Sequence, residues 1–341
     1  MKAKIYGASL LAVLVLCLCT IVWLRFSYTA QEEGTGEAQA GQEQGDGSAS
    51  PAETGQSAVA TPDSQISFTA LDDGSLSERT MDEYLIGVMA GEMPATFDIE
   101  ALKAQAVAAR TYILYKTMHE TPAHPDAAVC DDPTCCKAQL TDAEMQENWG
   151  EEYEQYRAKL VQATEATNGQ YLVYDGEPIQ AVFHSSSDGM TESSEELWSA
   201  EPYLVCVATP ESEQDVPNFV STVTSSVEGF SEAVLALYPQ ADLSGTPDTW
   251  VGQAVYSESG RVSSLQIGGV DIEANELRSM FGLRSTSFTL EYTDGQFVFT
   301  VRGFGHGVGM SQYGANVLAS QGLDYREILE HYYPGTELVS P

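Results

Sequence analysis

A short stretch of the chain concentrates side chains that bind transition metals. It spans thirteen residues and holds one imidazole and three thiols, those of His124, Cys130, Cys135 and Cys136. Zinc takes such a mixed nitrogen and sulfur set in tetrahedral geometry, and a loop rich in Asp and Pro can fold back around the ion. The stretch therefore predicts a zinc site. The alternatives are free buried thiols, or a disulfide from Cys130 or Cys136 to Cys206.

A second candidate is a single glutamate at the end of an apolar helical pattern. Residues 81–90 read MDEYLIGVMA, and Gly91-Glu92-Met93-Pro94 follows. Because proline forces the residue before it out of the helical region, Glu92 is expected at a turn. Apolar neighbours would raise the pKa of its carboxyl, so that it keeps a proton near neutral pH and can act as a general acid. The other interpretation is an ordinary capping or surface glutamate.

Two further segments combine histidine with hydroxyl groups and glycines. Residues 184–189 read HSSSDG, and residues 303–309 read GFGHGVG just before an expected helix over 311–320. Alternating glycines allow close backbone approach to a ligand or to another segment. No Lys-Ser or Lys-Thr follows them, as a phosphate-binding loop requires, and the His-Ser cluster lacks the glycine-flanked turn of a serine nucleophile. The segments predict saccharide-binding side chains, with an internally bonded His306 as the alternative: His184, Ser185, Ser187, His306, Ser311, Gln312 and Tyr313.

The elements that position these residues mix helices with hairpins. A helix is predicted over 99–118, capped by Asp98, with a buried stripe at three- and four-residue spacing. Arg110 falls outside that stripe, where it would either orient sugar or carboxylate groups or form a surface salt bridge. Asp-Gly turns predict hairpins over 171–184 and 288–301. Strands and helices do not alternate along the chain as they do in proteins with a parallel sheet. The predicted fold class is therefore α+β.

The chain begins with a candidate membrane anchor. Two lysines precede an uncharged run from Ile5 to Leu24, which as a helix is about 30 Å long and matches a bilayer core. We expect an uncleaved transmembrane helix within residues 1–28, with a cleavable signal peptide as the alternative. The lysines lie before the span, which places the N-terminus inside and the rest outside. Residues 29–65 are poor in large apolar side chains and are expected to form a flexible linker, followed by one exterior domain over 66–341.

The net charge of the chain limits the kinds of molecule that it can bind. The 341 residues include 15 Lys and Arg against 50 Asp and Glu, a net charge of −35. Such a chain repels phosphate backbones, which excludes nucleic-acid binding through a basic groove. A neutral polymer such as a glycan, or a basic partner, fits this charge. The simpler explanation is that acidity keeps an exported domain soluble.

Three segments taken together resemble a known family. They are residues 84–94 continuing through 102–112, residues 183–192 followed by Trp198, and residues 303–315. In this order they resemble the stage II sporulation protein D family, over roughly residues 66–334.

The resemblance implies a lytic transglycosylase of peptidoglycan. Such an enzyme cuts glycan strands whose stem peptides are gone and leaves 1,6-anhydro-MurNAc ends, with Glu92 as the acid. The resemblance also implies work with a peptidoglycan amidase and a membrane protein during engulfment of the forespore, from the mother-cell membrane. His124, Cys130 and Cys136 match the family's zinc ligands, and Cys135 stands where the family commonly has histidine. Cys135 is then either a replacement ligand or a spectator, with water as the fourth ligand. Because some relatives enhance amidases, the alternative is a non-catalytic peptidoglycan-binding module.

Overall fold

The computed structural model describes residues 61–119, 121–132 and 135–340. Helices and mostly antiparallel sheets are mixed, which confirms the α+β class. The expected anchor at 5–24 and most of the expected linker lie outside the described residues. Within the described ranges, no helix combines the length and apolar character that a membrane span needs. The folded part begins earlier than residue 66, because η1 (Asp63–Gln65) already places the buried Asp63 in the core.

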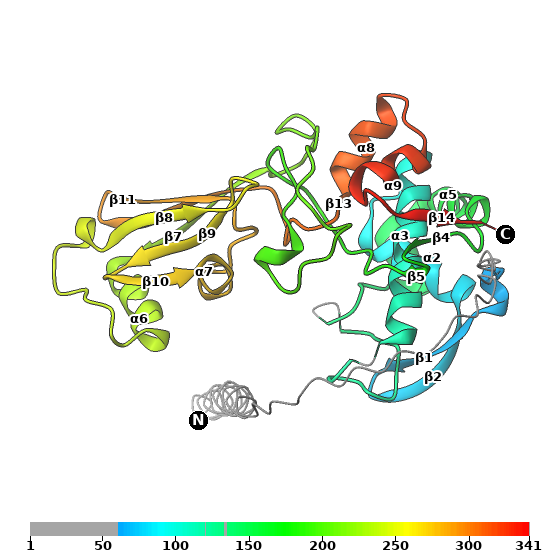
Figure 1. The fold of residues 1–341 in the computed structure, drawn as a ribbon, viewed down its shortest axis with the longest axis horizontal. Helices are drawn as coiled ribbons and strands as arrows, with labels where there is room; N and C mark the ends of the chain where they lie inside the picture. Colours follow the sequence, from blue (N-terminus) through cyan, green and yellow to red (C-terminus); the bar gives the residue numbers. More distant parts are fainter. Residues whose placement is uncertain (1–60, 120, 133–134, 341) are drawn as a thin grey trace, which may run out of the picture. The chain divides into compact units, whose positions relative to one another are not determined.

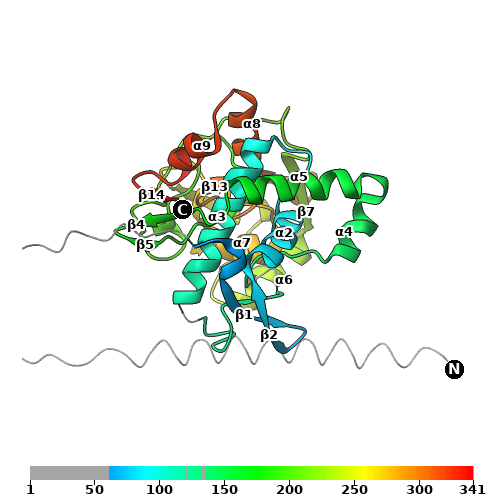
Figure 2. The ribbon, with the colours of Figure 1, turned by 90° about the vertical axis from the view of Figure 1, so that its right-hand side faces the viewer.

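The first hydrophobic core is organised around α3 (Ile99–Met118). It packs against α2 (Met81–Glu92), α5 (Tyr153–Ala166), α8 (Gln312–Ser320) and α9 (Tyr325–Tyr332). Figures 1 and 2 show α8 and α9 near one end of α3 and the β1–β2 hairpin near its other end. Five small residues of α3 are fully buried, which lets neighbours approach from several sides: Ala101, Ala104, Ala106, Ala108 and Ala109. The predicted cap is confirmed, since the Asp98 side chain accepts the Glu100 N–H.

Small sheets surround this core and hold the segments singled out above. In the first sheet, β1 (Ser67–Asp72) lies between β2 (Ser75–Thr80) and β3 (Val129–Cys130), and β3 runs parallel to β1. The predicted Asp175-Gly176 turn joins β4 (Tyr171–Tyr174) to β5 (Glu177–Pro178), with β14 (Glu337–Val339) on the other side. In a third sheet, β6 (Phe183–His184) pairs in parallel with β13 (Met310–Ser311). This pairing brings the two histidine and hydroxyl segments side by side.

The chain between the two histidine and hydroxyl segments forms a second hydrophobic core, with its own set of buried residues. Its antiparallel sheets have the orders β11-β12-β7 and β10-β9-β8, and α6 (Val227–Leu237) and α7 (Ala274–Phe281) accompany them. The strands are β7 (Val220–Ser226), β8 (Val251–Tyr256), β9 (Val262–Ile267), β10 (Val270–Glu273), β11 (Phe288–Thr293) and β12 (Gln296–Arg302). Stacked aromatic rings centre it, with Phe230 and Phe297 at 3.8 Å between centroids. The single expected domain over 66–341 therefore contains two hydrophobic cores.

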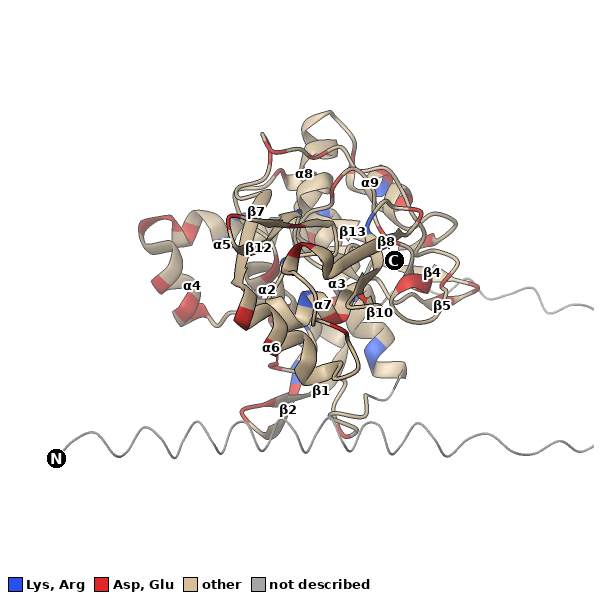
Figure 3. Cartoon of the chain, turned by 90° about the vertical axis from the view of Figure 1, so that its left-hand side faces the viewer, with Lys and Arg blue, Asp and Glu red and all other residues tan. Residues whose placement is uncertain are grey.

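Acidic side chains are spread over both parts of the described chain. In Figure 3 red acidic positions are spread widely and blue basic positions are sparse, and α4 (Asp142–Trp149) carries several acidic residues. Few cations are available to bind an anionic ligand.

Candidate functional site

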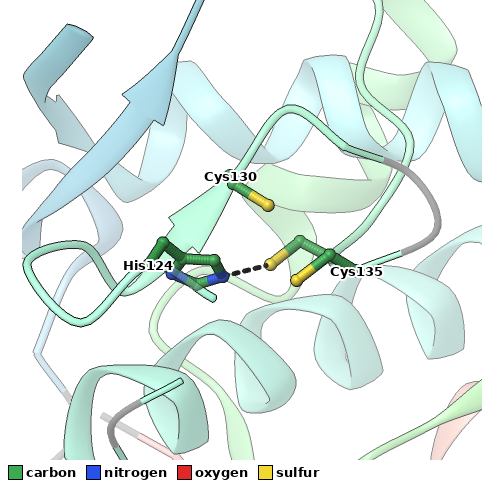
Figure 4. A group of neighbouring side chains, drawn as sticks. His124, Cys130 and Cys135 are labelled. Carbon is green, nitrogen blue, oxygen red and sulfur yellow. Dashed lines mark hydrogen bonds between the residues drawn. The ribbon is translucent and has the colours of Figure 1, made fainter. Parts of the chain in front are cut away.

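The four predicted metal ligands converge. The side-chain donor atoms of His124, Cys130, Cys135 and Cys136 all lie within 4.8 Å of one another. Figure 4 shows the His124 imidazole and the cysteine sulfurs turned toward one another, with His124 Nε2 at 3.3 Å from Cys136 Sγ. Pairing of β3 with β1 fixes Cys130. The N–H groups of Cys135 and Cys136 both donate to the carbonyl of Asp132, which turns the chain back toward Cys130.

The arrangement suits zinc. His124 Nδ1 lies 2.8 Å from the Ala127 carbonyl, to which it donates, and this leaves Nε2 free as a ligand. Three thiolates and one imidazole complete a tetrahedral set. Burial raises the pKa of the Cys136 thiol to about 12, so a cation would have to displace its proton on binding. The four described cysteines are free, and the alternative of a disulfide to Cys206 does not occur among them.

Glu92 is the last residue of α2, so the helix continues past the predicted run of 81–90 and the chain leaves it only at Met93. The following residue, Met93, is extended because Pro94 comes next. The carboxyl group is half-buried, and its Oε1 accepts the Ala138 N–H at 2.8 Å. Burial raises the pKa of Glu92, while the Lys137 charge and the Ala138 N–H partly offset that rise. The group therefore holds its proton to a higher pH than an exposed glutamate does.

Two glycines let the loop after the metal cluster approach α2 closely. A Cβ at Gly91 would lie 2.9 Å from the Ala138 carbonyl oxygen, and a Cβ at Gly87 would lie 2.8 Å from that of Leu140. The Leu140 N–H also donates to the Gly87 carbonyl. Gly87 and Gly91 are four residues apart and lie on one face of α2. Because neither has a side chain, the segment that carries Ala138 can come close enough to bond Glu92.

Lys137, which the sequence analysis did not single out, lies between the metal loop and the acid. Its ammonium is 3.7 Å from the centroid of the Phe183 ring and 4.5 Å from that of Tyr112. Burial lowers the pKa of Lys137 to about 8, and the Glu92 charge acts in the other direction. A sequence signal was present, since this lysine directly follows the last ligand cysteine in a chain with few cations.

His306 reaches the same place from the glycine-rich segment. Its Nε2 donates to the Phe183 carbonyl at 3.1 Å, and its Nδ1 accepts the Val308 N–H at 3.1 Å. Burial lowers the pKa of His306 to about 3, helped by the Lys137 charge, so the ring is neutral. The exposed Trp198 packs edge-on against it, with centroids 5.9 Å apart. Through Phe183, the His306 segment and Lys137 become neighbours.

Tyr313 and Ser185 are the other predicted saccharide ligands that remain accessible. Both are half-buried, and the Tyr313 N–H donates to the Ser185 carbonyl. The Tyr313 ring meets Phe97 edge-on at 4.9 Å. Phe97 is buried in the first hydrophobic core, so the Tyr313 ring lies against that core.

The remaining predicted saccharide ligands of the two segments hold the loops instead. His184 and Ser187 are buried and bond to each other at 2.6 Å, and His184 Nδ1 donates to the Val308 carbonyl. The buried Ser311 caps α8 and donates to Glu211, and the buried Gln312 donates to Gln105. The side chains of these four residues are therefore buried among protein partners in this structure.

Arg110 forms a salt bridge, which was the alternative to a saccharide-binding role. Its guanidinium is fully buried in a two-point ion pair with Asp63, with nitrogen–oxygen distances of 2.6 and 2.7 Å. It also donates to the Gln170 carbonyl at 3.0 Å. The predicted surface position is wrong because α3 is covered on this side by the residues around η1 and the end of α5.

Glu211 is a second carboxyl that the sequence analysis missed. It accepts the Ser187 N–H at 2.7 Å, the Ser311 hydroxyl at 2.5 Å and the Thr209 hydroxyl, and burial raises its pKa. Arg261, from the second core, donates to Ser187 at 3.1 Å. This buried network ties the two histidine and hydroxyl segments together.

Comparison with known proteins gives consistent results. The sequence model of the Stage II sporulation protein family matches residues 74–174, which include Glu92 and the metal cluster. Stage II sporulation protein D of Bacillus subtilis is 33% identical over 99% of this chain and 96% of its own length. That of Bacillus amyloliquefaciens is 38% identical over 77% of this chain and 75% of its own. The amidase enhancer of Bacillus subtilis is 31% identical over 75% of this chain and 40% of its own. The chain belongs to the stage II sporulation protein D family.

Proposed function

We propose that this protein is a peptidoglycan lytic transglycosylase of sporulation. It cleaves peptide-free glycan strands between MurNAc and GlcNAc and leaves 1,6-anhydro-MurNAc ends. The observation that carries the proposal is the half-buried Glu92, whose pKa is raised by burial and whose carboxyl is held by a single N–H.

The reaction needs one carboxyl group in two protonation states. Protonated Glu92 gives its proton to the glycosidic oxygen as the bond from that oxygen to MurNAc C1 breaks. The resulting carboxylate is stabilised by the Ala138 N–H and the Lys137 charge. It then takes the proton of the MurNAc C6 hydroxyl while that oxygen attacks C1 and closes the anhydro ring. No water is consumed, and Glu92 ends protonated.

The proposed reaction needs one carboxyl group, whereas hydrolysis typically uses two. Of the described carboxyl groups, burial raises the pKa of Glu92 and Glu211. Glu211 is buried and bonded to three donors, which leaves Glu92 as the acid.

The metal cluster supports the acid indirectly. A zinc ion held by three thiolates and an imidazole has four protein ligands, and such closed sites are structural. His124, Cys130, Cys135 and Cys136 would hold it. The ion would fix the loop whose Ala138 N–H reaches Glu92.

The cellular setting follows from the anchor and the family. We propose that residues 5–24 anchor the protein in the mother-cell membrane, with the catalytic part outside, facing the septal space. Its partners would be a peptidoglycan amidase that removes the stem peptides and a membrane protein of the engulfment machinery.

The test is mass spectrometry of products from peptide-free glycan strands incubated with the purified, zinc-loaded full chain. Anhydro ends are expected from the native protein and from Glu83→Gln, which changes an exposed glutamate in the first turn of α2. Glu92→Gln should form them about 10²–10⁴-fold more slowly. Reducing MurNAc ends would indicate hydrolysis. Strand binding without cleavage by any of the three proteins would favour a non-catalytic binding module, a role suggested by the name of the related amidase enhancer.

A further inference from the structure

The Lys137 ammonium is held by aromatic rings rather than by acceptors. It lies over the faces of Phe183 and Tyr112, at 3.7 and 4.5 Å from the centroids. The ring faces carry negative potential and attract the cation. Among residues 61–119, 121–132 and 135–340, no ion pair or hydrogen bond of this ammonium is formed. Three N–H donors on a half-buried charge are thus left for a ligand.

The Lys137 side chain belongs to the segment that contacts the proposed acid, Glu92. Its neighbour Ala138 donates its N–H to Glu92, and the Phe183 carbonyl accepts from His306. Lys137 therefore lies between the acid and the glycine-rich segment, where a sugar that reacts with Glu92 would be bound.

Two arginines of the described chain are paired with carboxylates. Arg110 is bound to Asp63, and Arg302 pairs with Asp188 and Glu213. In a chain of net charge −35, a cation without such a partner beside the acid needs an explanation.

Peptidoglycan offers one anionic group at the reacting sugar. MurNAc carries a lactyl ether whose carboxyl group forms the amide link to the stem peptide, and removal of the peptide exposes a free carboxylate. We propose that Lys137 binds this lactyl carboxylate through a charge-assisted hydrogen bond, and so selects strands without peptides. The inference rests on the proposed function and assigns the substrate selectivity of the same site to one residue. An intact stem peptide presents a neutral amide at this point, whose carbonyl can accept a hydrogen bond from the ammonium but offers it no opposite charge.

Binding measurements test the selectivity without catalysis. In a Glu92→Gln background, fluorescence anisotropy compares peptide-free strands with the same strands whose lactyl carboxylates have been converted to methylamides. We expect the carboxylate strands to bind about tenfold more tightly. Adding Lys137→Met should bring the two affinities within about twofold of each other, and Lys137→Arg should keep most of the difference. The matched control is Lys103→Met, which removes a lysine paired with Glu100 on α3.

Each outcome separates this inference from the proposed function. Equal affinity for both strands, or a preference that survives Lys137→Met, overturns the inference even if the native protein makes anhydro ends. A preference that disappears in Lys137→Met supports it even if no strand is cleaved, in which case only the transglycosylase is lost. Because Lys137 follows Cys136, zinc content is measured in each variant. If Lys137→Met loses its zinc, the decision passes to Lys137→Gln and Lys137→Arg, compared at equal zinc content.

Discussion

Glu92 and Glu211 are both carboxyl groups whose pKa is raised by burial, yet their surroundings differ. Glu211 is buried and accepts one N–H and two hydroxyl groups. Glu92 is half-buried and accepts one N–H, and no described residue donates to its second oxygen. A carboxyl saturated with donors holds two segments together, whereas one with a free oxygen can exchange a proton with a ligand. The number of hydrogen-bond donors thus distinguishes the structural carboxyl group of Glu211 from the carboxyl group of Glu92.

Removing Glu211 should cost stability. Glu211→Ala leaves the Ser187 N–H and the hydroxyls of Ser311 and Thr209 buried without their acceptor. We expect a loss of about 3–5 kcal/mol in the free energy of unfolding, measured by urea denaturation. At a pH of about 4, where the Glu92 carboxyl is protonated in the folded protein, Glu92→Gln should unfold within about 0.5 kcal/mol of the native protein.

The control is Glu213→Ala, two residues away, which removes an exposed carboxyl paired with Arg302. Such exposed pairs contribute roughly 0–1 kcal/mol. If Glu211→Ala were no less stable than Glu213→Ala, the distinction between the two carboxyl groups would not stand.

Disrupting the metal cluster should affect the acid through the loop. Cys130→Ser weakens the ligand set, which should free the segment that carries Ala138 and lower the rate of anhydro-end formation about 10–100-fold. Zinc content and the reaction of Cys135 and Cys136 with a thiol reagent report on the cluster itself. Cys206→Ser is the matched control, because that half-buried thiol lies against Glu192 and outside the cluster. A Cys130→Ser protein with full activity and no zinc would show that Glu92 does not depend on this loop.

Local patterns predicted the parts of this site that short stretches of chain determine. The α2 terminus follows from Pro94, and the convergence of the four metal ligands needs only a turn within thirteen residues. The Asp-Gly turns at 175 and 294 also form as predicted, each with positive φ at both residues.

Long-range partners decided what the local patterns could not. Arg110 is buried because Asp63, 47 positions away, pairs with it. The Ser311 hydroxyl donates its hydrogen bond to Glu211, 100 positions away. Hydroxyls and imidazoles suit sugars and buried networks equally well, so residue type alone cannot separate the two uses. Lys137 was missed because its ring partners are brought to it only by the fold.

The smallest expected effect is the pH dependence of stability due to Glu92 alone. The folded protein keeps the Glu92 proton above the ordinary pKa of 4.5, whereas the unfolded chain releases it there. The folded state then binds more protons, so stability falls as pH rises from about 4.5 through the raised pKa, by about 1.4 kcal/mol for each pH unit that separates the unfolded from the folded pKa. Glu92→Gln removes this contribution and leaves that of Glu211 in place. The difference in unfolding free energy between the native protein and Glu92→Gln should therefore change in favour of the variant across this window and level off above it. A difference that stayed constant from pH 4 to 8 would mean that Glu92 titrates as an exposed glutamate does, and the comparison with Glu211 would lose its basis.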